Sequence, residues 1–223
     1  MAKHNHPTGD SVVVVGLGRF GGSVANSLVR LGHDVLGIDE DAGLVQEWSE
    51  RLTHVVQADA TRSDVLRQLG VHEFAHAVVG IGNDIEASVL TVLALEDLGV
   101  SDIWAKATTA KHGRILERTG AHHVIYPEAA MGERVAHLVT GKMIDFIEFD
   151  DGFAIAKTNA PVESHGKTLS ESALRSKYGV TVVGVKRRRA DFTYAKADTI
   201  VEAGDILIVS GSTVVVERFA ALN

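Results

Sequence analysis

A run of four valines followed by a glycine-rich hexapeptide constrains the fold of this chain more than any other feature. Residues 11–15 read Ser-Val-Val-Val-Val, and Gly16, Gly18 and Gly21 follow in the spacing G-x-G-x-x-G. The apolar run is typical of a parallel strand that is buried on both faces. Residues 20–31 then carry apolar side chains at helical spacing. A strand, this glycine turn and a helix in succession predict the phosphate-binding turn of a Rossmann-type domain.

Each glycine of this turn has its own physical role. Gly16 permits the tight turn, Gly18 lets the backbone approach a pyrophosphate, and Gly21 allows close packing of the helix on the sheet. Free N–H groups and the positive end of the helix dipole then face the anion. Asp39 lies 23 residues after Gly16, where its carboxylate can accept hydrogen bonds from ribose hydroxyls. A tight turn without a ligand is the alternative interpretation.

Strands and helices alternate as far as about residue 126. We expect strands at 11–15, 34–39, 53–57, 75–81, 102–107 and 122–126, with helices at 20–31, 41–52, 84–98 and 111–119. Thr61-Arg62-Ser63-Asp64 resembles a capping box that would start a further short helix. Strict alternation of this kind predicts right-handed crossovers and a doubly wound parallel sheet, the α/β fold class.

The pattern changes after Pro127 and predicts a small α+β subdomain. We expect a helix at 128–140, a hairpin of strands 144–149 and 153–157 around Asp150-Asp151-Gly152, a helix at 170–178, strands at 180–186 and 206–210, and a terminal helix from 213. The boundary falls between 127 and 143. We therefore expect two domains, a nucleotide-binding domain at 11–140 and a C-terminal subdomain at 141–223.

Composition and charge exclude several classes of function. The formal net charge is -7, so we expect no nucleic-acid partner. The absence of cysteine excludes thiolate catalysis, cysteine-type zinc sites and disulfides, and it suits a reducing cytosol. Residues 1–10 are polar and do not resemble a signal peptide. No apolar stretch is long enough to cross a bilayer.

Three further features near the predicted nucleotide edge each allow two interpretations. Arg19 can form paired hydrogen bonds to phosphate oxygens, or it is a solvated loop arginine. Asp59 can accept a hydrogen bond from an adenine amino group, or it is a turn or cap aspartate. Gly80-Ile81-Gly82 can let the adenosine pass close to the backbone, or it marks an ordinary turn.

The chain lacks the usual signatures of catalysis. There is no Y-x-x-x-K spacing, and Gly166-Lys167-Thr168 lacks the P-loop glycine because Pro161 stands at that position. The eleven histidines show no H-E-x-x-H spacing, and we interpret them as structural or solvent-exposed.

Residues 186–189 form one basic run, either a charged hairpin or a local anion site. A small NAD-dependent oxidoreductase or NAD-redox sensor stays open as an alternative function.

The motifs together resemble a known family. The hexapeptide, Asp39, and residues 58–61 and 126–128 closely resemble the RCK domain, the regulator of potassium conductance. Similar stretches of its C-terminal subdomain are found at residues 166–169, 178–179 and 202–211. Size and order resemble the cytosolic regulatory subunit of Trk/Ktr-type potassium uptake systems, built from TrkA-N and TrkA-C domains.

This resemblance implies a ligand-gated regulatory protein and not an enzyme. ATP and ADP, and sometimes NAD(H), compete for the Rossmann site in that family. Its members form dimers that assemble into an octameric ring under a membrane subunit that translocates potassium. The resemblance places this chain in the cytoplasm, at the inner face of the cell membrane through that partner.

The resemblance also implies roles for individual residues. Arg19 stands where the family's arginine reaches the γ-phosphate, and Glu128 where a glutamate helps to hold a divalent cation such as Mg²⁺ or Ca²⁺. Charge compensation at a helix start is the alternative role of Glu128. Arg175 resembles an arginine that contacts cyclic di-AMP, although residues 194–198 lack the proline found in those relatives. The residues expected to contact the nucleotide are Gly16, Leu17, Gly18, Arg19, Phe20, Gly21, Asp39, Glu40, Asp59, Ala60, Ile81, Gly82 and Lys106.

Overall fold

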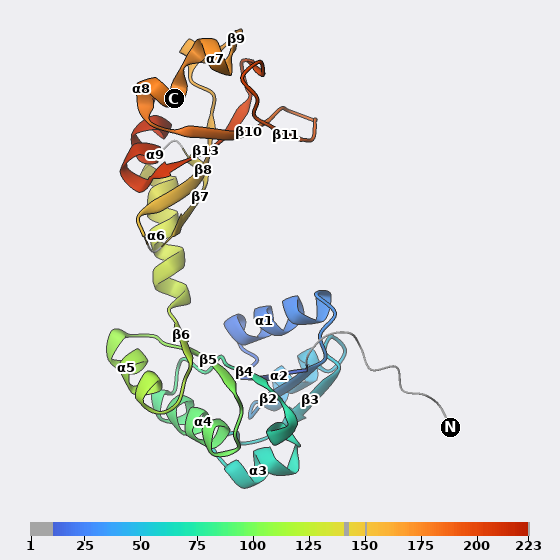
Figure 1. The fold of residues 1–223 in the computed structure, drawn as a ribbon. Coiled ribbons are helices and arrows are strands. Elements are labelled where there is room, and N and C mark those ends of the chain that lie inside the picture. The colour runs from blue at the N-terminus through green and yellow to red at the C-terminus, as the bar shows by residue number, and fades with distance from the viewer. Residues whose placement is uncertain (1–10, 141–142, 150, 223) are drawn as a thin grey trace. The chain divides into compact units, whose positions relative to one another are not determined.

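The computed structural model describes residues 11–140, 143–149 and 151–222. It separates into two compact units, with the division between Glu128 and Ala129. In Figure 1 the first unit runs from blue to green and the second from yellow to red. No helix within the described ranges is long and apolar enough to cross a membrane.

The described residues of the first unit form a parallel sheet of six strands in the order β3-β2-β1-β4-β5-β6. The chain moves outward from β1 to β3, then returns to the other side of β1 with β4, which is the switch point of a doubly wound fold. The predicted Rossmann-type sheet is confirmed. The strands are β1 (Val12–Val15), β2 (Val35–Asp39), β3 (His54–Gln57), β4 (His76–Val79), β5 (Asp102–Lys106) and β6 (His123–Ile125).

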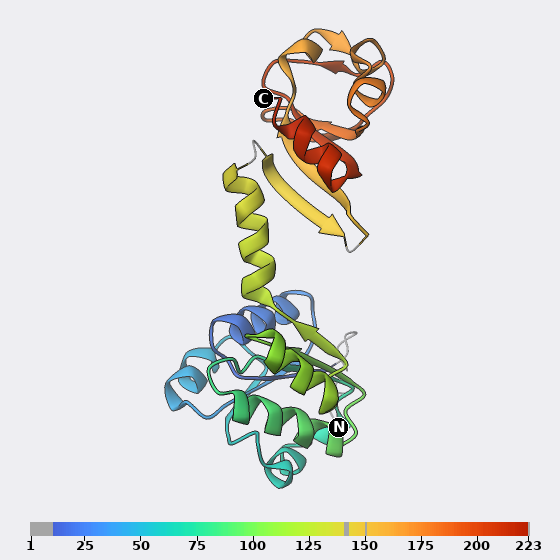
Figure 2. The same cartoon turned by 90° about the vertical axis from the view of Figure 1, so that its left-hand side faces the viewer.

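Helices cover both faces of this sheet (Figures 1 and 2). The valine run explains why, since Val12 and Val14 join one apolar core while Val13 and Val15 join the other. Leucines and alanines of the helices complete both cores. The helices are α1 (Arg19–Arg30), α2 (Ala42–Trp48), α3 (Ser63–Gln68), η1 (Val71–Glu73), α4 (Ile85–Asp97) and α5 (Ala110–Arg118).

The start of α3 differs from the prediction. The capping box expected at residues 61–64 is wrong, because Arg62 is the N-cap and no side chain caps the helix. The hydroxyl of Thr61 donates instead to Asp59 Oδ1 at 2.6 Å, and the backbone N–H of Thr61 donates to the same oxygen at 2.9 Å. Asp59 thereby closes a local turn that removes Thr61 from the helix start.

The described residues of the second unit form a five-stranded antiparallel sheet in the order β11-β10-β13-β8-β7 and a two-stranded sheet of β9 and β12. This is the predicted small α+β subdomain. Its elements are α6 (Pro127–Thr140), β7 (Met143–Phe149), β8 (Phe153–Asn159), η2 (Val162–Ser164), β9 (Lys167–Thr168), α7 (Leu169–Ser172), α8 (Leu174–Tyr178), β10 (Thr181–Lys186), β11 (Phe192–Tyr194), β12 (Ile200–Val201), β13 (Ile206–Ser212) and α9 (Thr213–Ala220).

Two details of the second unit were not predicted. The helix expected at 170–178 is two helices, α7 and α8, because Ala173 between them is left-handed at a φ of 50°. The strands β9, β11 and β12 are short and lack a clear alternating pattern. In the predicted hairpin turn, Asp150 lies outside the described residues, while Gly152 has a φ of 73°.

Helix α6 packs with the second unit, whereas the expected domain boundary after residue 140 assigned it to the first. Arg134 forms an ion pair with Asp145 of β7, the ring of His137 packs on Phe146, and Leu138 packs against the core of the second unit. These contacts join α6 to the strand that follows it, and the compact unit therefore begins at Ala129.

Candidate functional site

The glycine turn joins β1 to α1 at the carboxyl end of the sheet, beside the switch point between β1 and β4. Gly16 has a φ of 87°, which a residue with a side chain rarely adopts. A Cβ on Gly21 would lie 1.8 Å from the carbonyl oxygen of Gly16. No heavy atom lies within 4 Å of a Cβ built on Gly18, so the space in front of this residue is open. The backbone therefore has the shape of a phosphate cradle.

Helix α1 begins at this open space. Gly18 is its N-cap, no side chain caps its first turn, and no acidic residue occupies that turn. The first N–H groups of a helix have no partner within the helix, and the helix dipole places positive potential there. Arg19 is exposed at the first helical position. Backbone donors, dipole and guanidinium together fit a bound anion.

Asp39 at the end of β2 holds the glycine turn in place. Its Oδ2 accepts the backbone N–H of Leu17 at 2.6 Å, and its Oδ1 accepts that of Asp41 at 2.9 Å. The residue is 9% exposed. A carboxylate has about four acceptor sites, so two backbone bonds leave room for ribose hydroxyls. The sequence indicated a ligand contact at Asp39 but not this support of the turn.

The end of β4 closes one side of the turn. A Cβ on Gly80 would lie 2.9 Å from the carbonyl oxygen of Gly16, so the two backbones approach very closely. The side chain of Ile81 packs against Gly16, 3.1 Å from where a Cβ of that glycine would lie. Gly82 lies next to the amine of Lys106. The stretch 80–82 therefore packs directly against the glycine turn, and its contact with the adenosine stays a prediction.

Three further residues predicted to contact the nucleotide follow the carboxyl ends of β2 and β3, namely Glu40, Asp59 and Ala60. Glu40 is exposed, and its carbonyl oxygen accepts a hydrogen bond from Gln57. The hydroxyl and N–H of Thr61 lower the pKa of Asp59, which keeps this exposed carboxylate ionised. Ala60 is buried in the core, so only its backbone could face a ligand.

Lys106 and Glu128 form an ion pair next to the ring of Phe20 in the turn. Lys106 Nζ donates to Glu128 Oε1 at 2.6 Å and lies 5.8 Å from the centre of the Phe20 ring. The lysine side chain is 13% exposed and the glutamate side chain 67%. The hydrogen bond from Lys106, with a smaller contribution from the charge of Arg19, lowers the pKa of Glu128. Glu128 is thus an exposed carboxylate that one lysine ammonium already pairs.

Arg175 lies in the second unit. It is exposed on the short helix α8, and its carbonyl oxygen accepts the N–H of Gly179. The structure thus brings together the glycine turn, Asp39, the 80–82 stretch, Lys106 and Glu128 in the first unit.

The comparisons with known proteins agree with this architecture. The TrkA-N domain model matches residues 12–127, and the TrkA-C domain model matches residues 157–223. The chain belongs to the family of proteins that join a TrkA-N domain to a TrkA-C domain, as the resemblance of its motifs implied.

Several relatives match along nearly the whole chain. The chain is 37% identical to Ktr system potassium uptake protein C of Bacillus subtilis (strain 168), over 92% of this chain and 94% of that protein. It is 34% identical to Ktr system potassium uptake protein A of the same organism, over 92% and 93%. The identity to Ktr system potassium uptake protein A of Vibrio alginolyticus is also 34%, over 92% and 94%.

Solved structures share the fold at lower identity. The crystal structure of the GsuK RCK domain matches with a TM-score of 0.66 and 20% identity, over 98% of this chain. The GsuK channel bound to NAD matches with a TM-score of 0.64 and 19% identity, over 98% of this chain. The chain spans half the length of the first of these structures and 41% of the second.

Proposed function

We propose that this chain is the nucleotide-binding regulatory subunit that gates a potassium uptake system. The observation that carries the proposal is the glycine turn with Arg19 at its helix start, in a chain that aligns with Ktr potassium uptake proteins over nine-tenths of their length. An adenine nucleotide fits the described residues, because Gly18 leaves open space and the first turn of α1 offers uncapped N–H groups.

The residues of the cradle divide the recognition of the nucleotide. The first turn of α1 binds the phosphates that ATP and ADP share, and Asp39 accepts hydrogen bonds from the ribose. Arg19 is exposed at the edge of the cradle, where its guanidinium contacts the third phosphate of ATP. This ATP is bound either to the same chain or to a neighbouring copy of it. Only such a difference in affinity between two states can shift a conformational equilibrium. NAD(H) shares the adenosine and pyrophosphate and competes for the same groups.

Glu128 extends this site to a divalent cation, Mg²⁺ or Ca²⁺. Its carboxylate is ionised and exposed, and one of its oxygens accepts a hydrogen bond from Lys106. A cation at Glu128 competes with the lysine amine, which makes the Lys106–Glu128 pair sensitive to what occupies the cradle.

The proposed partners rest on the family resemblance. The subunit assembles with copies of itself, as dimers and then as an octameric ring, and docks in the cytoplasm on a membrane subunit that translocates potassium. Cyclic di-AMP at Arg175 is a second, independent proposal for the C-terminal unit. The oxidoreductase alternative is disfavoured, because two relatives that match 92% of this chain are potassium uptake proteins.

The test is calorimetric titration of ATP and ADP against the full chain and two variants. Arg19→Ala should weaken ATP binding by about tenfold or more, the worth of one charge-assisted phosphate contact, and ADP binding by much less. Arg30→Ala at the other end of α1 is the matched control and should change neither affinity. An equal loss for both nucleotides contradicts the role of Arg19. Hydride transfer to NAD in a substrate screen would favour the oxidoreductase.

A further inference from the structure

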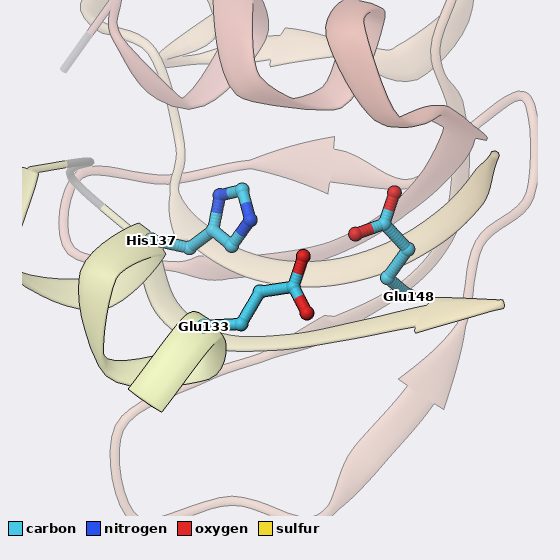
Figure 3. A group of neighbouring side chains, drawn as sticks. All are labelled: Glu133, His137 and Glu148. Atoms are coloured by element: carbon cyan, nitrogen blue, oxygen red, sulfur yellow. The ribbon is translucent and has the colours of Figure 1, made fainter. Parts of the chain in front are cut away.

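Three side chains that can ligate a metal meet in the second unit, far along the chain from the glycine turn. Glu133 and His137 lie one turn apart on α6, and Glu148 lies on β7 (Figure 3). One ligand atom from each lies within 4.8 Å of the other two. The sequence predicts structural or solvent-exposed histidines, since it shows no H-E-x-x-H spacing. Spacing does not reveal this group, because Glu148 comes from a different element than Glu133 and His137.

The imidazole of His137 is held from its far side. Its Nδ1 lies 2.9 Å from Glu217 Oε1 of α9, and its ring packs on Phe146 at 4.4 Å between ring centres. Its other nitrogen, Nε2, faces Glu133 and Glu148 (Figure 3). A carboxylate on one histidine nitrogen fixes the ring and leaves the other nitrogen as the ligand, the arrangement found behind most histidines that bind metals.

Glu148 is held in a similar way. The hydroxyl of Thr213, the first residue of α9, donates to Glu148 Oε1 at 2.6 Å. The bond leaves the other carboxylate oxygen available and fixes the side chain toward α6. Two of the three candidate ligands are thus oriented by side chains of α9, and Glu133 completes the group from the exposed side of the helix.

The local charge favours a cation. Glu133, Glu148 and Glu217 surround a single imidazole, and Glu133 and Glu148 line the same cleft. Arg134 lines this cleft too, but it forms an ion pair with Asp145, so that a carboxylate already compensates its charge. Three carboxylates next to one imidazole leave an excess of negative charge that a divalent cation would neutralise.

We infer that Glu133, His137 and Glu148 form a binding site for a divalent transition-metal ion of the Zn²⁺ type. Imidazole nitrogen suits Zn²⁺ better than Mg²⁺ or Ca²⁺, which prefer oxygen ligands throughout. Tetrahedral Zn²⁺ with bonds of about 2.1 Å needs ligand atoms about 3.4 Å apart, so the two exposed glutamates need to close by little more than about 1 Å. The ion links α6 to β7, and a solvent molecule takes the fourth position.

The test uses the full chain after treatment with a chelator, with His4→Gln and His6→Gln in the background because two histidines near the N-terminus could bind zinc on their own. Zn²⁺ titration by calorimetry should give one site per chain. Glu133→Gln and His137→Gln should each weaken it by tenfold or more, and Glu217→Gln by about tenfold through the orientation of the ring. Glu133→Gln leaves the His137–Glu217 pair intact. A loss of Zn²⁺ binding in this variant therefore cannot come from the loss of that structural contact.

Two controls separate this site from the one proposed at Glu128. Glu128→Gln and His54→Gln, an exposed histidine of β3, should leave Zn²⁺ binding unchanged. Co²⁺ should give the visible absorption of a nitrogen- and oxygen-bound ion in the parent chain, and this absorption should be lost in His137→Gln. Zn²⁺ binding that is equal in all variants, or no binding at micromolar Zn²⁺, would overturn the inference.

Discussion

The carbonyl oxygen of Gly16 and the Cα of Gly21 approach so closely that no side chain fits between them. Leu17, between the same two glycines, donates its N–H to the nearly buried carboxylate of Asp39. The turn is therefore fixed by the close backbone approach and by the Asp39 carboxylate, whereas Gly18 in the same turn leaves open space beside it. At the scale of single residues, Gly16 and Gly21 are thus required by the packing of the turn, and Gly18 is the glycine at which the proposed phosphates would lie.

Gly21→Ala should be strongly destabilising, because its new Cβ would lie 1.8 Å from the Gly16 carbonyl oxygen. Overpacking of this kind costs about 2 kcal/mol or more of unfolding free energy. Gly132→Ala in α6 is the matched control, since its Cβ meets nothing within 4 Å. It should instead stabilise the helix by about 0.5–1 kcal/mol. Urea denaturation of the two variants measures both effects, and similar midpoints would contradict this account of Gly21.

At the scale of elements, α6 is the helix whose contacts the periodicity of the sequence could not reveal. Arg134 and His137 on α6 contact Asp145 and Phe146 of β7, and Leu138 packs into the core of the second unit. The ion pair between Arg134 and Asp145 and the proposed metal ligands lie on the same two elements. Charged and polar side chains therefore make many of the contacts between α6 and β7.

This attachment should depend on pH. The hydrogen bond from Arg134 lowers the pKa of Asp145 below its ordinary value of 3.8. Since the pKa is lower in the folded chain, the stabilisation is fully present above the unfolded pKa and is lost as the pH falls through the folded one. Asp145→Asn should cost up to about 1 kcal/mol of unfolding free energy at pH 6.

The difference between the variant and the parent chain should shrink as the pH falls below 3.8. Thermal unfolding followed by circular dichroism between pH 6 and pH 2.5 measures it. Asp198→Asn, at an aspartate outside the helices and strands of the second unit, controls for a general loss of negative charge. A destabilisation by Asp145→Asn that is the same at both ends of the range would contradict the ion-pair account.

At the scale of the whole molecule, the chain has two compact units with separate apolar cores. The proposed nucleotide groups lie in the first unit, up to Glu128, and the proposed metal ligands in the second, from Glu133. Each ligand should therefore stabilise its own unit first. A ligand at 100 times its dissociation constant contributes about 2.7 kcal/mol to the state that binds it.

Hydrogen exchange measured by mass spectrometry can separate the two effects. ATP should slow exchange in peptides of residues 12–39, which hold the glycine turn and Asp39. Zn²⁺ should slow exchange in peptides of residues 129–149, which hold α6 and β7. ADP is the control for the third phosphate, and it should protect the same N-terminal peptides less strongly. Protection by ATP only in the second unit would contradict the assignment of the nucleotide site.

The sequence by itself determined the order and type of most elements and the glycine turn, because apolar periodicity and glycine spacing act over a few neighbouring residues. Only the tertiary structure decided the contacts between distant residues. Asp39 supports Leu17 across 22 residues, Lys106 pairs with Glu128 across 22, and Thr213 reaches Glu148 across 65. The short strands β9, β11 and β12 were missed for the same reason, since pairing with other strands fixes them and local propensity does not. The left-handed break falls on Ala173, a residue type that does not mark such a conformation in a sequence.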